Sequence, residues 1–264
     1  LGGGQLGRML ALAGARLGLK SVILCPDPDS PAFDVASEAF IADYDDEEAL
    51  AAFDQAIAAS ASRDAYFDAR GSSRLALNQH EAAMADFSRA IELNPHYGDA
   101  HQRFGIFLTA MGRFAEAHAA LTRAQESDPL SRIIATIAGY PSYYSRDYDA
   151  AVRQFRHVSQ IDPNFSMAHF RLGLTWAQMG QYDRALEELS ISKGLSNDRD
   201  VVAALGYVHA LRGDRTEVSA AIAELHERSR DTFVSPYQLA VIYVAMGDTA
   251  LAFEWLEKAL VEKS

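Results

Sequence analysis

The chain has 264 residues, of which 49% are hydrophobic, and its formal net charge is −12. This length exceeds one ordinary domain and favours either an elongated array or two unequal units. The sequence has no basic stripe, and its net negative charge would repel a phosphate backbone. Nucleic acid is therefore not an expected partner. No run of about 18 apolar residues occurs, so no membrane partner is expected.

Cysteine and histidine usage gives no sign of a metal or catalytic centre. Cys25 is the single cysteine, and no Cys/His pairing has zinc spacing. This is typical of a reducing compartment, so the predicted location is the cytoplasm. The eight histidines form no H-E-x-x-H pair, and neither a G-x-S-x-G motif nor a Walker loop occurs. We predict no catalytic residue, no metal and no cofactor.

The amino-terminal segment opens with a glycine-rich run. Gly2, Gly4 and Gly7 have the G-x-G-x-x-G spacing, which permits a tight turn and a close approach to a phosphate at a helix N-terminus. A helical run to about Gly18 and an apolar stretch ending at Leu24 follow in the order that this motif requires. Alone, the motif is a weak signal.

The wider string is more specific. The residues GGGQLGRMLALAGARLGLK, then VILCPDPDSPA, then ADYDD, resemble the amino-terminal domain of 5-(carboxyamino)imidazole ribonucleotide synthase, an ATP-grasp enzyme of purine biosynthesis. The resemblance runs from Leu1 to about Phe53. It implies a truncated, Rossmann-like α/β segment over residues 1–57, with vestigial nucleotide-binding positions at Gly3, Gly4, Gln5 and Leu6.

Two departures argue against ligase activity. Cys25 stands where the family has an acidic residue, so an acceptor for a ribose hydroxyl is missing. The carboxylate- and lysine-bearing domain that holds Mg-ATP in the family has no counterpart in the repeats that follow. Residues 58–63 are predicted to be a linker or a fusion junction. A working two-domain protein and a chance fusion of two reading frames both stay open.

The rest of the chain is repetitive. Gly71, Gly105, Gly139, Gly173 and Gly206 follow one another at intervals of 34, 34, 34 and 33 residues. A second series, predicted to need positive φ, comprises Gly112, Gly180, Gly213 and Gly247, with Asn78 and Arg146 at the equivalent places. Small residues follow, then large apolar ones such as Leu121, Phe155 and Leu189, which we expect to fill the gap between one hairpin and the next. Prolines at Pro95, Pro129 and Pro163 close three repeats.

This period and these residue types resemble the tetratricopeptide repeat family. The predicted fold class is therefore mainly α, a right-handed superhelix of about six helical hairpins over residues 64–264, with repeats near 64–97, 98–131, 132–165, 166–198, 199–232 and 233–264. Pro141 should kink the first helix of the third repeat. A helical bundle with glycines recurring by chance is the alternative, and four series in one phase argue against it.

The resemblance implies a scaffold that binds a protein or peptide through the concave groove. In the family, positions 2, 5, 9 and 12 of each first helix face this groove. The predicted groove residues are Tyr140, Tyr143, Met167, Phe170, Leu174, Tyr207, Tyr237 and Val241. Such a surface favours an apolar or amphipathic segment. Asp68 and Ser72 stand where a chaperone-tail clamp needs lysine and asparagine, which argues against a C-terminal carboxylate.

Other interpretations stay open at this stage. The groove residues could instead pack against neighbouring helices as core. The chain could be a purine-biosynthesis protein, or a remnant of one fused to repeats, or a nucleotide-sensing scaffold. The last hairpin is expected to expose Phe253, Leu256 and Leu260, so either more chain follows it or this end self-associates.

Overall fold

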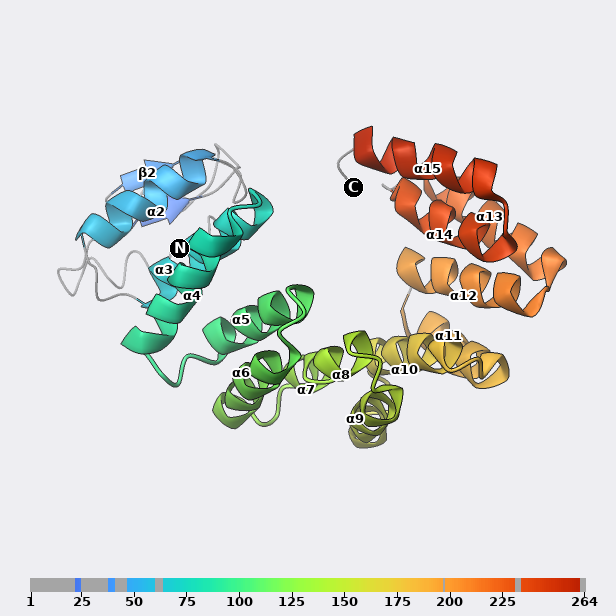
Figure 1. The fold of residues 1–264 in the computed structure, drawn as a ribbon, viewed down its shortest axis with the longest axis horizontal. Coiled ribbons are helices and arrows are strands. Elements are labelled where there is room, and N and C mark those ends of the chain that lie inside the picture. Colours follow the sequence, from blue (N-terminus) through green and yellow to red (C-terminus); the bar gives the residue numbers. More distant parts are fainter. Residues whose placement is uncertain are drawn as a thin grey trace. The chain divides into compact units, whose positions relative to one another are not determined.

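The computed structural model describes residues 22–24, 38–40, 47–59, 64–196, 198–230 and 234–261. The chain divides into two compact units, Leu1–Pro129 and Leu130–Ser264, and each is described by itself. Figure 1 labels the elements along the chain.

The amino-terminal unit joins a small parallel sheet to two helical hairpins. Strands β1 (Val22–Leu24) and β2 (Glu38–Phe40) pair in parallel, which agrees with the predicted α/β segment. Helix α2 (Glu47–Ala59) follows and packs on the first hairpin, where Ile57 contacts the cluster around Phe67. The hairpins are α3 (Asp64–Ala76) with α4 (His80–Leu93), and α5 (Gly98–Ala110) with α6 (Phe114–Ser127).

The carboxy-terminal unit consists of four further hairpins among its described residues. Their helices are α7 (Arg132–Ile137), α8 (Tyr140–Tyr144), α9 (Tyr148–Ile161), α10 (Ser166–Gln178), α11 (Tyr182–Leu195), α12 (Arg199–Arg212), α13 (Arg215–Arg228), α14 (Pro236–Met246) and α15 (Thr249–Val261). The predicted mainly helical fold of about six hairpins is confirmed.

Four of the five repeat glycines, Gly71, Gly105, Gly139 and Gly173, lie under a large side chain of their own hairpin, whereas Gly206 lies under Ile242 of the next one. A Cβ added to Gly173 on α10 would come 2.6 Å from Cγ of Leu189 on α11, and Gly139 is blocked in the same way by Phe155. The glycine therefore lets the two helices of one hairpin approach closely. The same large residues also reach the next hairpin, as expected: the ring of Phe87 on α4 packs against Phe104 and Phe107 of α5, with 6.4 and 6.5 Å between ring centroids.

The second glycine series ends the first helix of each hairpin with a left-handed residue. Gly112, Gly180, Gly213 and Gly247 have φ between 73° and 89°, and Asn78 and Arg146 have φ of 58° and 66°. The predicted positive φ is thus confirmed at the four glycines, and Asn78 and Arg146 adopt it at the equivalent places. Glycine suits this conformation because it has no Cβ to clash with the following carbonyl.

The predicted corners between repeats are also present. Helices α4, α6 and α9 stop one residue before Asn94, Asp128 and Asp162, whose ψ values are 90°, 82° and 93°. A residue that precedes proline is sterically disfavoured in the helical region, so the chain turns there. Two histidines fix such corners: Nε2 of His101 lies 2.9 Å from the carbonyl oxygen of Pro95, and His169 contacts that of Pro163 at the same distance.

Pro141 divides the first helix of the third hairpin in two. Helix α7 ends at Ile137, a turn over Ala138 and Gly139 follows, and α8 begins at Tyr140 with Pro141 in its first turn. Proline has no N–H for the helix ladder, and its ring clashes with the carbonyl four residues earlier. The predicted kink is confirmed as a break.

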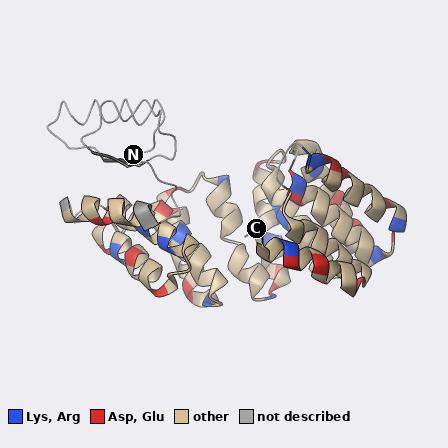
Figure 2. Cartoon of the chain, turned by 90° about the horizontal axis from the view of Figure 1, so that it is seen from above, with Lys and Arg blue, Asp and Glu red and all other residues tan. Residues whose placement is uncertain are grey.

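Charges are distributed over the helices of both units. Figure 2 shows Lys and Arg interspersed with Asp and Glu along the described helices. None of the helices in the described part of the chain is both long and apolar enough to cross a membrane.

Candidate peptide-binding surface

A set of aromatic side chains around one arginine gathers on the first helices of the carboxy-terminal unit. We call it the tyrosine face, and its members are Tyr140 and Tyr143 of α8, Phe170, Arg171 and Leu174 of α10, and Tyr207 of α12. All six are half-buried. The five apolar and aromatic members pack against the core cluster that includes Phe155, Leu172 and Trp176. The face therefore rests on a rigid support.

The break at Pro141 arranges the tyrosines of α8. The ring of Tyr143 packs edge-on against Tyr144, with 5.1 Å between ring centroids, and against Tyr148 at 5.9 Å. Edge-to-face pairs of this kind are favourable beyond the area they bury. They hold the ring of Tyr143 in one orientation, which lowers the entropy that a ligand would have to offset.

The hydroxyls of Tyr140 and Tyr143 stay protonated at neutral pH. Burial raises the pKa of Tyr143 to about 12, and the nearby hydroxyls of Tyr144 and Tyr148 add to the effect. Burial also raises the pKa of Tyr140, and the guanidinium of Arg171 offsets part of that shift. Protonated phenols can donate as well as accept hydrogen bonds.

The guanidinium of Arg171 lies against two rings of this aromatic surface. Its Cζ is 4.3 Å from the ring centroid of Tyr140 and 5.5 Å from that of Phe170. Both distances fall within the range of cation–π attraction. Its Nε is buried and has no hydrogen-bond partner among the described residues.

The predicted groove residues divide into two groups. Five of them belong to the tyrosine face: Tyr140, Tyr143, Phe170, Leu174 and Tyr207. Met167 is half-buried in the first turn of α10. On α14, Tyr237 is 56% exposed and Val241 is half-buried. The vestigial nucleotide-binding positions Gly3, Gly4, Gln5 and Leu6 lie outside the described residues.

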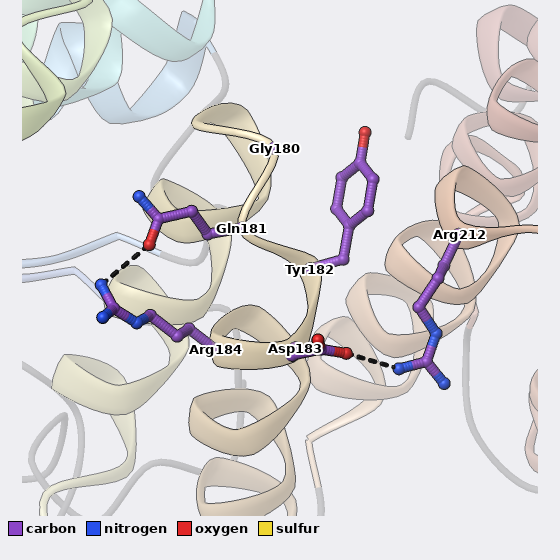
Figure 3. A pocket seen from close by; sticks show the side chains of 6 residues that line it. All are labelled: Gly180, Gln181, Tyr182, Asp183, Arg184 and Arg212. Atoms are coloured by element: carbon purple, nitrogen blue, oxygen red, sulfur yellow. Dashed lines mark hydrogen bonds and ion pairs between the residues drawn. The ribbon is translucent and has the colours of Figure 1, made fainter.

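A hollow of about 460 Å³, separate from the tyrosine face, lies where α10 turns into α11 (Figure 3). Its charged side chains are already partnered. Arg184 donates to Gln181 at 2.8 Å, and Arg212 pairs with Asp183 at 2.9 Å and also with Asp214. No unsatisfied charge points into this hollow from its lining, so it makes a weaker case for a ligand than the tyrosine face. Among the described residues no group of His, Cys, Asp or Glu is placed to hold a metal ion.

The last hairpin exposes an apolar surface, as expected. Phe253 is 60% and Leu260 is 80% exposed, whereas Leu256 is half-buried. Phe253 and Leu256 line a hollow of about 250 Å³ with Val244 and Ala252. We call this surface the α15 face.

Hairpins with a glycine at the packing position, a left-handed turn and proline corners define an α-helical repeat array. Three tetratricopeptide repeat models match residues 74–138, 143–200 and 237–260. The chain belongs to the tetratricopeptide repeat family over this part of its length. A model of the ribonucleotide synthetase preATP-grasp domain matches residues 1–63, which confirms the resemblance of the amino-terminal segment.

Curated relatives match the two parts separately. N5-carboxyaminoimidazole ribonucleotide synthase of Staphylococcus haemolyticus is 54% identical over 50 residues, and that of Brucella melitensis is 55% identical over 51 residues. Each match covers 19% of this chain but only 13% and 14% of the respective synthase. Small glutamine-rich tetratricopeptide repeat-containing protein 2 of Mycosarcoma maydis is 30% identical over 86 residues, which is 33% of this chain and 24% of that protein.

Solved structures share the fold at low sequence identity. A tetratricopeptide repeat protein from Parabacteroides merdae has a TM-score of 0.65 and 14% identity, and covers 91% of this chain and 83% of its own. PilW, a type IV pilus biogenesis factor, has a TM-score of 0.62 and 17% identity over 86% of this chain and 94% of its own. Pseudomonas aeruginosa pilF has a TM-score of 0.54 and 20% identity over 74% and 88%.

The sequence reasoning missed Arg171 as a member of the surface. A signal was present, since Arg103 stands two repeat periods earlier at the same repeat position. Tyr144 and Tyr148 were missed because their contribution depends on how the break at Pro141 turns α8.

Proposed function

We propose that this protein is an interaction scaffold that binds an apolar or amphipathic segment of another protein on its tyrosine face. The tetratricopeptide fold supports the general role. The specific surface is supported by one observation: half-buried aromatic side chains from three successive first helices, α8, α10 and α12, pack on one continuous core cluster. Large, rigid aromatic side chains of this kind are the usual anchors of protein interfaces. Met167 on α10 and, on α14, Tyr237 and Val241 complete the proposed surface.

Replacing Tyr140, Phe170 or Tyr207 by alanine, one at a time, should weaken binding of a partner peptide by about 1–3 kcal/mol each. Each substitution removes a ring that packs on the surface of the core cluster and would be buried further by the bound peptide. Binding is to be measured by fluorescence anisotropy with a peptide selected on the full-length protein from a random dodecapeptide library.

The matched control is Tyr237→Ala, because Tyr237 is 56% exposed and lies at the margin of the proposed surface. Tyr237→Ala should weaken peptide binding less than any of the substitutions of Tyr140, Phe170 and Tyr207. Circular dichroism must show unchanged helicity in each variant. If the three substitutions instead melt the helices, and affinity per folded molecule is unaltered, these side chains are core and the assignment fails.

We propose that the chain has no ligase activity by itself, with residues 1–57 as a truncated Rossmann-like segment, residues 58–63 as a junction and residues 64–264 as the repeat array. The short match to the synthases supports this. No release of phosphate is expected when the protein is given Mg-ATP, aminoimidazole ribonucleotide and bicarbonate. Turnover at a rate above the background would show that catalysis does not need the missing part.

We further propose that two copies associate through the α15 face. Val152 and Leu186 occupy the repeat position of Phe253, and they are 5% and 9% exposed against 60% for Phe253. Both belong to the cluster that joins α9, α10, α11 and α12. The α15 face is thus built like a surface on which another hairpin stacks, and the same face of a second copy supplies one.

Sedimentation velocity over a range of concentrations tests this association. The wild-type chain should shift from monomer to dimer, and Phe253→Ser should move the midpoint to at least about tenfold higher concentration, because it removes a large buried ring from the contact. The control Ile161→Ser changes a side chain that is 65% exposed elsewhere. Equal behaviour of all three proteins would refute the dimer.

A further inference from the structure

Two arginines stand at the same repeat position, two periods apart, in different surroundings. Arg103 on α5 is held by polar groups of α3: its Nη1 lies 3.5 Å from Oδ2 of Asp68 and donates to Oγ of Ser72 at 2.9 Å. Asp68 is buried, and the pKa of its carboxyl is raised by that burial and lowered by Arg103. The chain thus supplies its own anion to Arg103.

Arg171 on α10 has neither an aspartate nor a serine at the equivalent positions. Thr136 stands at the position of Asp68, is fully buried, and donates its hydroxyl to the carbonyl oxygen of Arg132 at 2.8 Å. Tyr140 stands at the position of Ser72 and offers the face of its ring to the guanidinium instead. No ion pair joins Arg171 to any described residue, and its buried Nε lacks an acceptor.

A half-buried guanidinium that has no anionic partner, and whose Nε has no acceptor, is costly to keep, and the cost is offset when a carboxylate docks on it. The cation–π contacts with Tyr140 and Phe170 hold the guanidinium in place but leave its N–H groups without an anion. The apolar rings around it exclude water, which strengthens an ion pair formed there.

We infer that Arg171 is the anchor for an acidic side chain of the bound segment, so that the segment carries an Asp or Glu flanked by large apolar residues. This rests on the proposed binding role of the tyrosine face. The carboxylate supplies Arg171 with the negative charge that Asp68 supplies to Arg103, and the apolar flanks lie on the rings of Tyr140, Phe170 and Tyr207.

The test is a selection with the full-length protein on bead-displayed random dodecapeptides that are acetylated at the N-terminus and amidated at the C-terminus. Wild type should enrich sequences with Asp or Glu between apolar residues. Replacing that acid by Gln in the best peptide should weaken binding about tenfold or more, as expected for a charge-assisted hydrogen bond. Arg171→Gln should abolish the acidic preference, and Arg171→Lys should keep part of it.

Thr136→Asp provides a second route, because it restores an internal carboxylate at the position of Asp68 and should compete with the acidic peptide. Arg103→Gln is the matched control in the amino-terminal unit and should leave the preference unchanged. Circular dichroism checks that each variant is folded. If one variant does not fold, the others still decide.

Four results overturn the inference. Enriched apolar peptides without acidic residues, or an acidic preference that Arg171→Gln retains, contradict it while leaving the binding role intact. A parallel library of peptides with free C-termini distinguishes a side-chain carboxylate from a terminal one. If peptides are enriched only from that library, Arg171 binds a terminal carboxylate instead. Enrichment of no peptide in either library contradicts both the inference and the proposed function.

Discussion

Replacing Phe155 by alanine should lower the free energy of unfolding by about 3–5 kcal/mol. Phe155 is fully buried on α9, directly over Gly139, in the cluster that supports the tyrosine face. Its removal leaves a cavity beside Gly139 and the cluster residues Leu172 and Trp176, which lose their contacts with the ring. Urea unfolding followed by far-UV circular dichroism measures the change.

His157→Ala is the control for this prediction, since His157 is exposed on the same helix. It should alter the free energy of unfolding by no more than about 0.5 kcal/mol. In an array of this kind stability depends mainly on contacts between neighbouring hairpins. The Phe155→Ala substitution should therefore destabilise helices α7–α10 more than the other helices. A Phe155→Ala loss of less than about 1 kcal/mol would mean that this cluster does not support the third hairpin.

Replacing Gly173 by valine is expected to cost about 2–3 kcal/mol. The new Cβ would lie 2.6 Å from Cγ of Leu189 and 3.1 Å from the carbonyl oxygen of Ala185. Leu189 is fully buried and Ala185 contributes a backbone atom, so neither can move without separating α10 from α11. The measurement is again urea unfolding.

Gly194→Ala tests the same chemistry without the clash. Gly194 is a helical residue of α11, and a Cβ there would meet nothing within 4 Å. Alanine reduces the entropy of the unfolded chain, so this change should stabilise the protein by about 0.5–1 kcal/mol. If Gly173→Val proved as harmless as Gly194→Ala, the close approach of the two helices would be wrong.

The fold could be predicted from the sequence because each repeat places the same residue type under the same constraint. Asn78 and Arg146 show how far this extends, since both adopt the positive φ that their place in the glycine series requires. The break at Pro141 was predictable for the same reason, because it depends on one local rule. Such features are determined by a few residues that are neighbours in the sequence.

Features that depend on packing between elements were harder to foresee. The sequence indicates that Leu189 and Phe155 are buried, but not whether they meet a glycine of their own hairpin or the next one. The contact between Ile57 on α2 and the first hairpin crosses the boundary expected at residues 58–63, which local sequence patterns could not show. Arg171 was overlooked because its character depends on Thr136 and Tyr140 in another helix rather than on its own sequence neighbours.

Hydrogen–deuterium exchange of the full chain, with and without a saturating selected dodecapeptide, tests the binding role most directly. The tyrosine face is built from α8, α10 and α12, so the peptide should slow exchange in these three helices and leave the amino-terminal unit unchanged. Slowed exchange confined to α2–α6 or to α15, or no change in any helix, would contradict the assignment of the binding surface.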